Sequence, residues 1–138
     1  MGKAGWGFRV EIDGIPDIPI LGVTGLGSEV EVTEYQDGVN PRRIQRIPGA
    51  VRYHNIVLTY AGTEGRAFFE WHKSALDGNA SRRNGAVVLI GPDRADAASW
   101  TFSNGWPVKY EGPALNADAG ADVPIESIEI VHEGLELE

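Results

Sequence analysis

Apolar and polar residues alternate along most of this chain, in the period-two pattern typical of half-buried β-strands. The segment Phe8–Ile12 places an apolar residue at every second position. The segment Glu29–Tyr35 does the same, with two valines on one face and Glu29 and Glu31 on the other. One face of that segment is therefore expected to meet water. Further strands are predicted over Ile18–Val23, Asn55–Tyr60, Gly85–Ile90, Trp100–Phe102, Trp106–Tyr110 and Val123–His132.

The last of these predicted strands changes phase along its length. Ile125 lies on one parity, whereas Ile128 and Ile130 lie on the other. Such a switch predicts a β-bulge, or a strand that changes partners. Pro124 cannot donate a hydrogen bond to a sheet, so we expect it at the start of a strand or at an edge.

One segment has the period of a helix instead. Apolar residues recur three, four and seven positions apart through Phe68 and Trp71, which gives a stripe wide enough to cover a sheet. Thr63 is the predicted N-cap, Glu64 suits the first turn, and Asp77-Gly78 provides the stop. Seven or eight short strands, frequent turns and one helix predict a mainly β fold. We expect a small antiparallel β-barrel or sandwich with one flanking α-helix, in a single domain over residues 1–138.

The segment Gln36–Gly49 has no apolar periodicity and contains two prolines and two glycines. An exposed loop of about a dozen residues is therefore predicted there, and loops of that length are usually functional or disordered. The segment carries Arg42, Arg43 and Arg46. These arginines favour a functional loop, and a mobile solvated loop is the alternative.

Charge is sorted into blocks of single sign. Glu11–Asp37 holds seven acids and no base, Asn40–Tyr53 holds four arginines and no acid, and Glu111–Glu138 holds eight acids and no base. A solvated face normally mixes the two signs, so this arrangement indicates copies that attract one another head to tail. The pattern favours assembly over catalysis.

Composition restricts the partners further. The net charge of −8 argues against stable binding of duplex DNA, which needs a basic surface. The chain has no cysteine, so a disulfide framework, a thiolate metal site and a thiol nucleophile are excluded. No apolar run approaches the roughly 18 residues of a membrane helix, so we expect no membrane insertion by this chain alone. The amino end shows no signal peptide, and a cytoplasmic origin is the simplest interpretation.

Catalytic and ligand-binding chemistry has weak support in the sequence. Most of the acids lie on alternating strand positions or in turns, where solvated or interface roles are the ordinary outcome. His54, His72 and His132 lie far apart and none has a partner at metal-ligand spacing, so no metal or cofactor is expected. Three tryptophans could line a ligand or sugar pocket, although core positions are commoner for such residues. They are Trp71, Trp100 and Trp106.

Several short motifs occur together in one order along the chain. The carboxyl half contains Trp100–Ala117, then Ile125–Glu129 and His132–Leu135. The amino half contains Phe8–Gly14, Val23–Leu26, Glu34–Gly38, Ile47–Gly49 and Asn55–Ile56. Together they resemble the tail-tube proteins of contractile phages and of phage-like contractile injection systems. The resemblance extends over nearly the whole chain.

That resemblance implies a structural role without catalysis. Six copies would join their sheets edge to edge in a ring, and rings would stack head to tail into a hollow tube inside a contractile sheath. It implies sheath, baseplate and terminator proteins as further partners, and DNA or protein as cargo in the lumen of a virion tail or injection particle. A monomeric β-barrel module that binds a small ligand or glycan is the alternative.

The resemblance also gives the charged residues a place. The arginine segment looks like the long loop that reaches a neighbouring ring, so Arg42, Arg43 and Arg46 are expected to meet acids of the next copy. Glu29 and Glu31 are expected on a surface of the tube, such as the lumen. An acidic lumen would let nucleic acid or acidic cargo pass without binding.

Overall fold

The computed structural model describes residues 5–117, 120 and 123–138 of the chain. Strands dominate this part, and one helix interrupts them. The first strands in chain order are β1 (Gly7–Ile12), β2 (Ile20–Thr24), β3 (Ser28–Gln36), β4 (Ile44–Tyr53) and β5 (Ile56–Ala61). They are followed by α1 (Arg66–Leu76), β6 (Arg83–Ile90), β7 (Asp96–Glu111), β8 (Ile125–Val131) and β9 (Gly134–Leu137).

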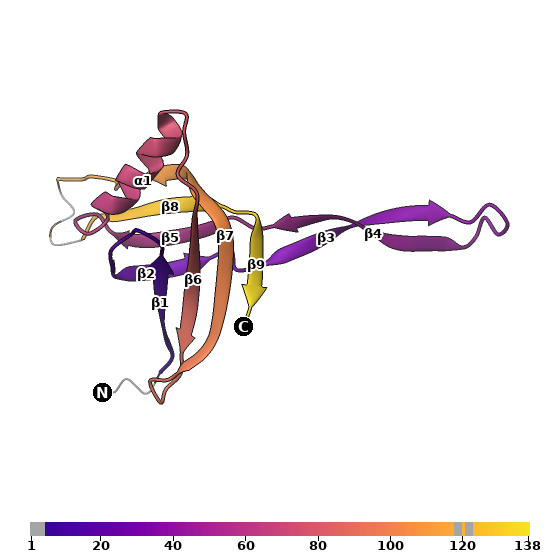
Figure 1. Cartoon of the computed structure of the whole chain (residues 1–138), viewed down its shortest axis with the longest axis horizontal. Helices are drawn as coiled ribbons and strands as arrows, with labels where there is room; N and C mark the ends of the chain where they lie inside the picture. The colour runs from indigo at the N-terminus through magenta and orange to yellow at the C-terminus, as the bar shows by residue number, and fades with distance from the viewer. Residues whose placement is uncertain (1–4, 118–119, 121–122) are drawn as a thin grey trace.

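The long strand β7 joins two halves of one antiparallel sheet. Its amino-terminal part pairs with β6 on one side and with β9 on the other, and its carboxyl-terminal part pairs with β8. The strand order is β1-β6-β7-β8-β5-β2, with β9 added on β7. Figure 1 shows β7 curving between the two halves, with α1 beside the ends of β7 and β8. The predicted small antiparallel β-barrel or sandwich with one flanking helix is confirmed.

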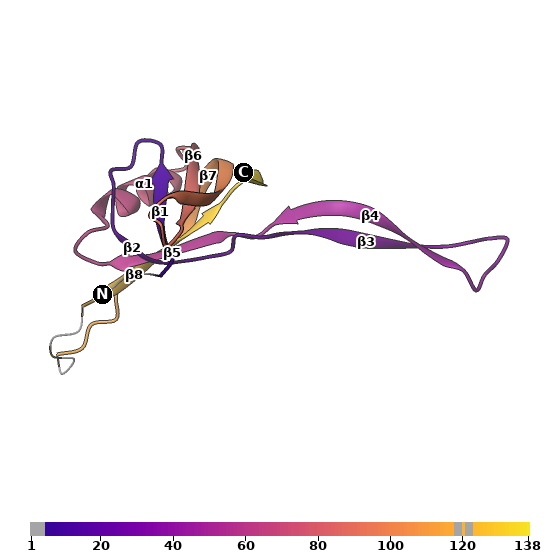
Figure 2. The same ribbon diagram turned by 90° about the horizontal axis from the view of Figure 1, so that it is seen from below.

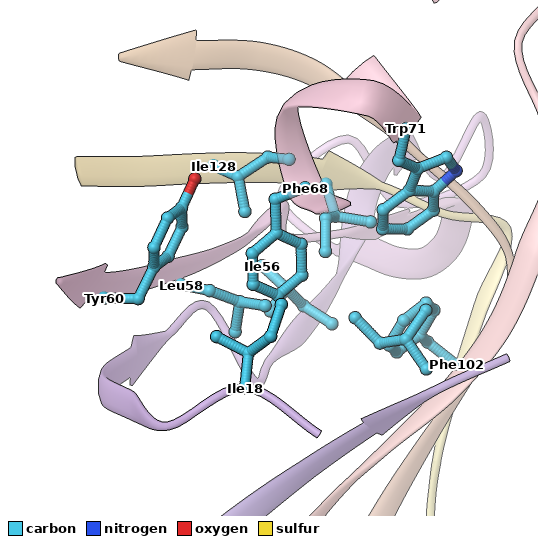
Figure 3. Close-up of a cluster of buried hydrophobic side chains, with 10 residues drawn as sticks. Ile18, Ile56, Leu58, Tyr60, Phe68, Trp71, Phe102 and Ile128 are labelled. Carbon is cyan, nitrogen blue, oxygen red and sulfur yellow. The ribbon is translucent and has the colours of Figure 1, made fainter. Parts of the chain in front are cut away.

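The core lies between the two halves of the sheet and the helix. Along β5, Ile56, Leu58 and Tyr60 are fully buried, and the residues between them are half-buried. This alternation follows from the period of a strand that buries one face. Phe68 and Trp71 of α1 pack on the same cluster, which Figure 3 shows together with Ile18, Phe102 and Ile128.

The helix begins later than the sequence predicts. Its N-cap is Gly65, and no side chain caps it, so the prediction of Thr63 as N-cap is wrong. Thr63 and Glu64 instead form a turn in which the Glu64 amide donates to the Ala61 carbonyl over 2.9 Å. A Cβ at position 65 would come within 1.8 Å of the Tyr60 ring, so the helix can approach the core only through a glycine.

The predicted end of the helix is confirmed. Asp77 is the C-cap, and its amide donates to the Lys73 carbonyl over 2.9 Å. Gly78 follows in the left-handed region with φ +88°, which glycine adopts at little cost. On the buried side, His72 donates from Nδ1 to the Pro107 carbonyl over 2.9 Å, which ties the helix to β7.

The bulge predicted for the last strand lies instead in its neighbour β7. Strand β8 pairs with β5 without a register shift from Ile125 to Ile130, so the phase switch of the apolar residues is not a bulge. The irregularity lies in β7, where the pairing with β8 skips Val108. Ile125 has the opposite parity because it faces away from the core, with 47% of its surface exposed. Pro124 directly precedes β8, as expected.

The close contact between Gly65 and Tyr60 gives a test of the packing. We expect Gly65→Ala to lower the free energy of unfolding by about 1–3 kcal/mol, the usual range for overpacking a core. The matched control is Gly7→Ala on β1, where a Cβ would meet no atom within 4 Å; there the change should stay within about 0.5 kcal/mol. Urea denaturation followed by tryptophan fluorescence measures both. Equal stabilities of the two variants would contradict this packing.

Candidate assembly surfaces

Strands β3 and β4 form a two-stranded sheet of their own, here called the ribbon (Ser28–Gln36 and Ile44–Tyr53). Within the described part of the chain, no other strand pairs with it. Figures 1 and 2 show the ribbon projecting from the body as a long arm. Every residue of both strands is exposed. An isolated two-stranded ribbon is at best marginally stable in water, so it needs a partner from outside the chain.

The ribbon occupies much of the segment predicted as a loop. Strand β3 includes Gln36 and strand β4 begins at Ile44, so the prediction of an irregular loop over Gln36–Gly49 is wrong for half of its length. Residues 37–43 alone connect the two strands. The alternation is interrupted in β4 because Pro48-Gly49 lies in its middle, where the register with β3 shifts. On β3 this shift lies between Val30 and Val32.

Side-chain turns shape the tip of the ribbon. The Asp37 carboxylate accepts from the Val39 amide over 2.9 Å, and the Asn40 side chain accepts from the Arg42 amide over 3.2 Å. Such turns are the usual role of Asp and Asn in short connections. They place Arg42 and Arg43 at the far end of the arm, both exposed. Neither guanidinium forms an ion pair with any residue of the described ranges.

The two faces of the ribbon differ in chemistry. Val30 pairs with Val51, and Val32 pairs with Pro48, so these side chains share one face. The three valines are 50%, 56% and 62% exposed, for Val30, Val51 and Val32 respectively. The opposite face carries Glu29. The same face continues into the Glu34–Arg46 pair. Exposed apolar residues that gather on one face are typical of an interaction site.

Three of the five charged residues predicted as site residues, one contact arginine and the two tube-surface acids, already have partners within the ribbon or at its root. Arg46 lies on β4 outside the tip, and its Nε is 3.2 Å from a carboxylate oxygen of Glu34. Glu31 lies 3.3 Å from Arg52, and Glu29 lies 3.1 Å from Nε2 of His54. Exposed pairs of this kind contribute only about 0–1 kcal/mol each. Of the three candidate arginines, the two at the tip are the ones without a partner.

The body carries an acidic groove on the face formed by β1, β6, β7 and β9. One row of this sheet runs in register from Glu11 of β1 to Glu136 of β9, with Ala86 and Thr101 between them. The row therefore has a carboxylate at each end and small residues in its middle. The groove has a volume of about 650 Å³. Five acids line it, namely Glu11, Asp13, Glu133, Glu136 and Glu138. Sequence reasoning did not find this groove, because it depends on which strands are neighbours.

Part of the acidity of the groove is neutralised within the chain. Arg9 binds Asp96 through two hydrogen bonds of 2.9 and 3.0 Å and Glu11 through one of 2.6 Å. The hydrogen bonds from Arg9 lower the pKa of Asp96, and the two carboxylates raise the pKa of Arg9. Arg82 lies 3.0 Å from Glu133. No ion pair within residues 5–117, 120 and 123–138 involves Glu136, so the groove keeps a negative surplus.

The tryptophans considered for a ligand pocket do not come together in one. Trp71 is 2% exposed, lies in the core and donates from its indole to the Ser81 carbonyl over 2.6 Å. Neither Trp100 nor Trp106 lines the groove. The three histidines are used in hydrogen bonds, and among the residues the structure describes no three His, Asp or Glu side chains gather as metal ligands.

One polar group in the core stands apart. The Tyr60 hydroxyl is buried close to the Glu126 carboxylate. Burial raises the pKa of Tyr60, and the nearby Glu126 carboxylate raises it further. The pKa of Tyr110 is raised for the same two reasons. Both phenols therefore stay neutral across the physiological range.

In the described ranges no helix is both long enough and apolar enough to cross a membrane.

A small antiparallel sandwich that extends a bare ribbon belongs to the class of structural subunits that assemble with one another. The model of the T4-like virus tail tube protein gp19 family matches residues 4–136, and the chain belongs to that family. It is therefore a structural subunit of an inner tube. The family resemblance and the function expected from the sequence are both confirmed.

Solved structures show the same fold. The tube chain of an extracellular contractile injection system, in a PVC sheath-tube complex, has a TM-score of 0.82 at 23% identity, covering 95% of this chain and 87% of that chain. A chain of the anti-feeding prophage baseplate has a TM-score of 0.82 at 20% identity, with coverages of 95% and 91%. Hcp1 from Flavobacterium johnsoniae has a TM-score of 0.60 at 20% identity, with coverages of 94% and 93%. No curated protein sequence matches the chain.

The exposure of the ribbon predicts its dynamics in the unassembled chain. Amides of β3 and β4 should exchange with deuterium at least about a thousandfold faster than those of β5 and β8, because local opening there breaks few buried contacts. Hydrogen exchange measured by mass spectrometry or NMR on dilute, unassembled protein tests this. Comparable protection of the ribbon and of β5 would show that the ribbon is stable without a partner.

Proposed function

We propose that this chain forms rings of six copies that stack head to tail into the hollow inner tube of a contractile phage tail or phage-like injection system. The observation that carries the proposal is the ribbon, a two-stranded arm with an exposed apolar face and two arginines at its tip that form no ion pair with the described residues. A monomer gains nothing from such an arm. A neighbouring copy that covers it would supply the burial that the chain lacks.

The arginines at the tip have a candidate receptor on the body. Arg42 and Arg43 are exposed and have no ion-pair partner among the described residues, and the acidic groove has a carboxylate at each end of its row and small residues between them. The tip lies at the far end of the arm from the body, so it meets the groove of another copy rather than its own (Figure 1). We infer that the tip of one subunit enters the groove of a subunit in the next ring. Arg46 would then act mainly within the ribbon, against Glu34.

The remaining partners follow from the family and its neighbours. The similar chains come from solved structures of a sheath-tube complex, a sheath/tube terminator, a baseplate and a tube-terminating cap. We propose the corresponding sheath, baseplate and terminator proteins as partners of this chain, and DNA or protein as cargo. The subunit would be made in a bacterial cytoplasm, work in the assembled particle and carry out no chemistry. Glu29 and Glu31 would lie on a tube surface that keeps acidic cargo from sticking.

Charge reversal at the tip tests the docking of the arginines. The double variant Arg42→Glu and Arg43→Glu should fold normally and form no long tubes at ordinary salt, because repulsion by the groove replaces attraction. Arg66→Glu with Lys73→Glu on α1 changes the net charge equally and should still form tubes. Negative-stain electron microscopy and sedimentation measure the outcome. Long tubes from the tip variant would exclude the tip as a stacking contact.

A compensating change makes the test specific. Adding Asp13→Arg and Glu136→Arg in the groove to the double tip variant should restore tube formation, because the signs are then reversed on both sides. Rescue identifies the groove as the receptor. The quadruple variant carries the changes at both the tip and the groove, and a second variant carries Asp13→Arg and Glu136→Arg alone. If the quadruple variant folds but stays unassembled while the groove variant still forms tubes, the tip binds elsewhere.

The apolar face of the ribbon is tested separately. Val32 is 62% exposed in the single chain, so Val32→Asp should change the stability of the unassembled subunit by less than about 0.5 kcal/mol. Burial of one valine contributes roughly 1.5–3 kcal/mol, so the protein concentration needed for assembly should rise about tenfold or more. Val32→Ile serves as the apolar control. Unchanged assembly of the aspartate variant would mean that this face stays solvated in the tube.

A further inference from the structure

The apolar face of one half of the sheet extends beyond the core. Across β1, β6, β7 and β9, residues that pair in register form rows, and every second row lies on the same face. One such row contains Ile12, Phe102 and Leu135, which belong to the core or pack on it. The next two rows on this face lie toward the start of β1 and hold apolar residues alone. They are Val10, Val87, Trp100 and Leu137, then Phe8, Leu89 and Ala98.

The far part of this face has no second layer in the described part of the chain. Phe8 and Leu137 are exposed, and Leu89 and Trp100 are half-buried. None of these four residues belongs to the core cluster or packs on it. In Figure 1, the lower ends of β1, β6 and β7 extend past α1 and past the half formed by β5 and β8. We call this surface the apolar patch (Phe8, Leu89, Ala98, Trp100 and Leu137).

A hollow adjoins the apolar patch at the start of β1. It has a volume of about 350 Å³, and Trp6, Phe8, Ile90 and Arg94 line it together with three glycines. Trp6 is exposed like Phe8. The surface is therefore uneven, with room for aliphatic side chains between aromatic rings.

The other face of the same strands is polar. It carries Arg9 and Glu11 of β1, Ser99 and Thr101 of β7, and Glu136 of β9. A sheet with one polar and one apolar face is typical of a layer that buries its apolar side against a second layer. The apolar patch is thus a buried type of surface that the single chain leaves open.

The ribbon has the complementary deficiency. It is a single layer whose apolar face presents Val30, Val32 and Val51 to solvent. Two sheets that pack face to face bury both apolar faces. The ribbon points away from the body in both views, so it does not reach the apolar patch of its own chain (Figures 1 and 2). Each copy therefore offers one uncovered sheet face and one single-layer sheet to its neighbours.

We propose that the apolar face of the ribbon of one copy packs on the apolar patch of a neighbouring copy, where it forms the missing second layer. Identical copies supply the two surfaces in equal number, and a contact between two different surfaces can continue around a ring. Neither Trp100 nor Leu137 lines the acidic groove, so an occupied patch leaves the groove free for a tip. The inference rests on the proposed function, because it names the surface of the neighbouring copy that covers the ribbon.

Cross-linking tests the contact directly. The chain has no cysteine, so full-length proteins with the single changes Val32→Cys and Leu137→Cys each carry one thiol. Both positions are exposed in the unassembled chain. Mixed in equal amounts under assembly conditions and treated with a short bismaleimide, the two proteins should give covalent dimers that contain one of each. Mass spectrometry of the linked peptides identifies the joined positions.

Ser99→Cys is the matched control for the patch. Ser99 directly precedes Trp100 on β7 and therefore lies on the opposite face. Mixed with Val32→Cys, it should give at least about tenfold fewer mixed dimers, because its thiol points away from the ribbon. Reaction with N-ethylmaleimide in the unassembled chains verifies that each thiol is accessible. Equal yields from the two mixtures would overturn the proposal.

Substitution in the patch gives a second readout. Leu137→Asp should raise the protein concentration needed for assembly about tenfold or more, because it places a carboxylate in an apolar contact. Leu76 on α1 is exposed to the same extent as Leu137, 65% for each. Leu76→Asp is therefore matched in residue type and exposure, and it should leave that concentration unchanged. Circular dichroism verifies folding of the unassembled variants, and sedimentation measures assembly.

The results separate this contact from the tube itself. Mixed dimers through positions 32 and 137 in material that shows no tubes by electron microscopy would support the contact and contradict the proposed function. Tubes that form without these dimers would overturn the contact and leave the proposed function standing. Unchanged assembly of Leu137→Asp would also overturn it, because the patch would then be open to solvent or to a different protein.

Discussion

The structure depends on one constraint: the chain builds a β-ribbon whose apolar face it cannot cover. Hydrophobic burial is the main favourable term in folding, and the body satisfies it through Ile56, Leu58, Ile128 and the helix side chains. The ribbon does not, since all of its residues are exposed. A segment with this sequence is stable only when other molecules complete it. Folding and assembly are therefore two stages of the same process in this protein.

Close contacts at the root of the ribbon fix its direction relative to the body. Gly25 at the root adopts φ +91°, and a Cβ there would lie 1.9 Å from the Asn55 carbonyl oxygen, so the two strands can pass this closely only at a glycine. The connection between β4 and β5 is also bound to β8, because Nδ2 of Asn55 donates to a carboxylate oxygen of Glu129 over 2.8 Å. Packing at the root thus supplies the rigidity that the ribbon itself lacks.

The sequence predicts the elements of the body well and the assembly surfaces poorly. Alternation identifies β5 because one of its faces is buried, and Asp77-Gly78 marks the helix end because only glycine takes that conformation easily. Alternation misses β4, because Pro48-Gly49 and a register shift interrupt the pattern in the middle of that strand. Charge blocks indicate attraction between copies, but the pairing of Arg46 with Glu34 follows from strand register, which residue types do not reveal. The acidic groove is hidden for the same reason.

Apolar and charged contacts have different roles in such an assembly. Exposed ion pairs contribute about 0–1 kcal/mol each, whereas burial of one valine contributes roughly 1.5–3 kcal/mol. The apolar face of the ribbon is then the source of strength, and the charges select the geometry. Groove against groove brings carboxylates together, and tip against tip brings arginines together, so both symmetric contacts are repulsive. Under the proposed docking, tip against groove attracts, and such a contact between two different surfaces of one subunit gives an open assembly where its rotation does not close into a ring. All subunits of a tube built by this docking would point the same way.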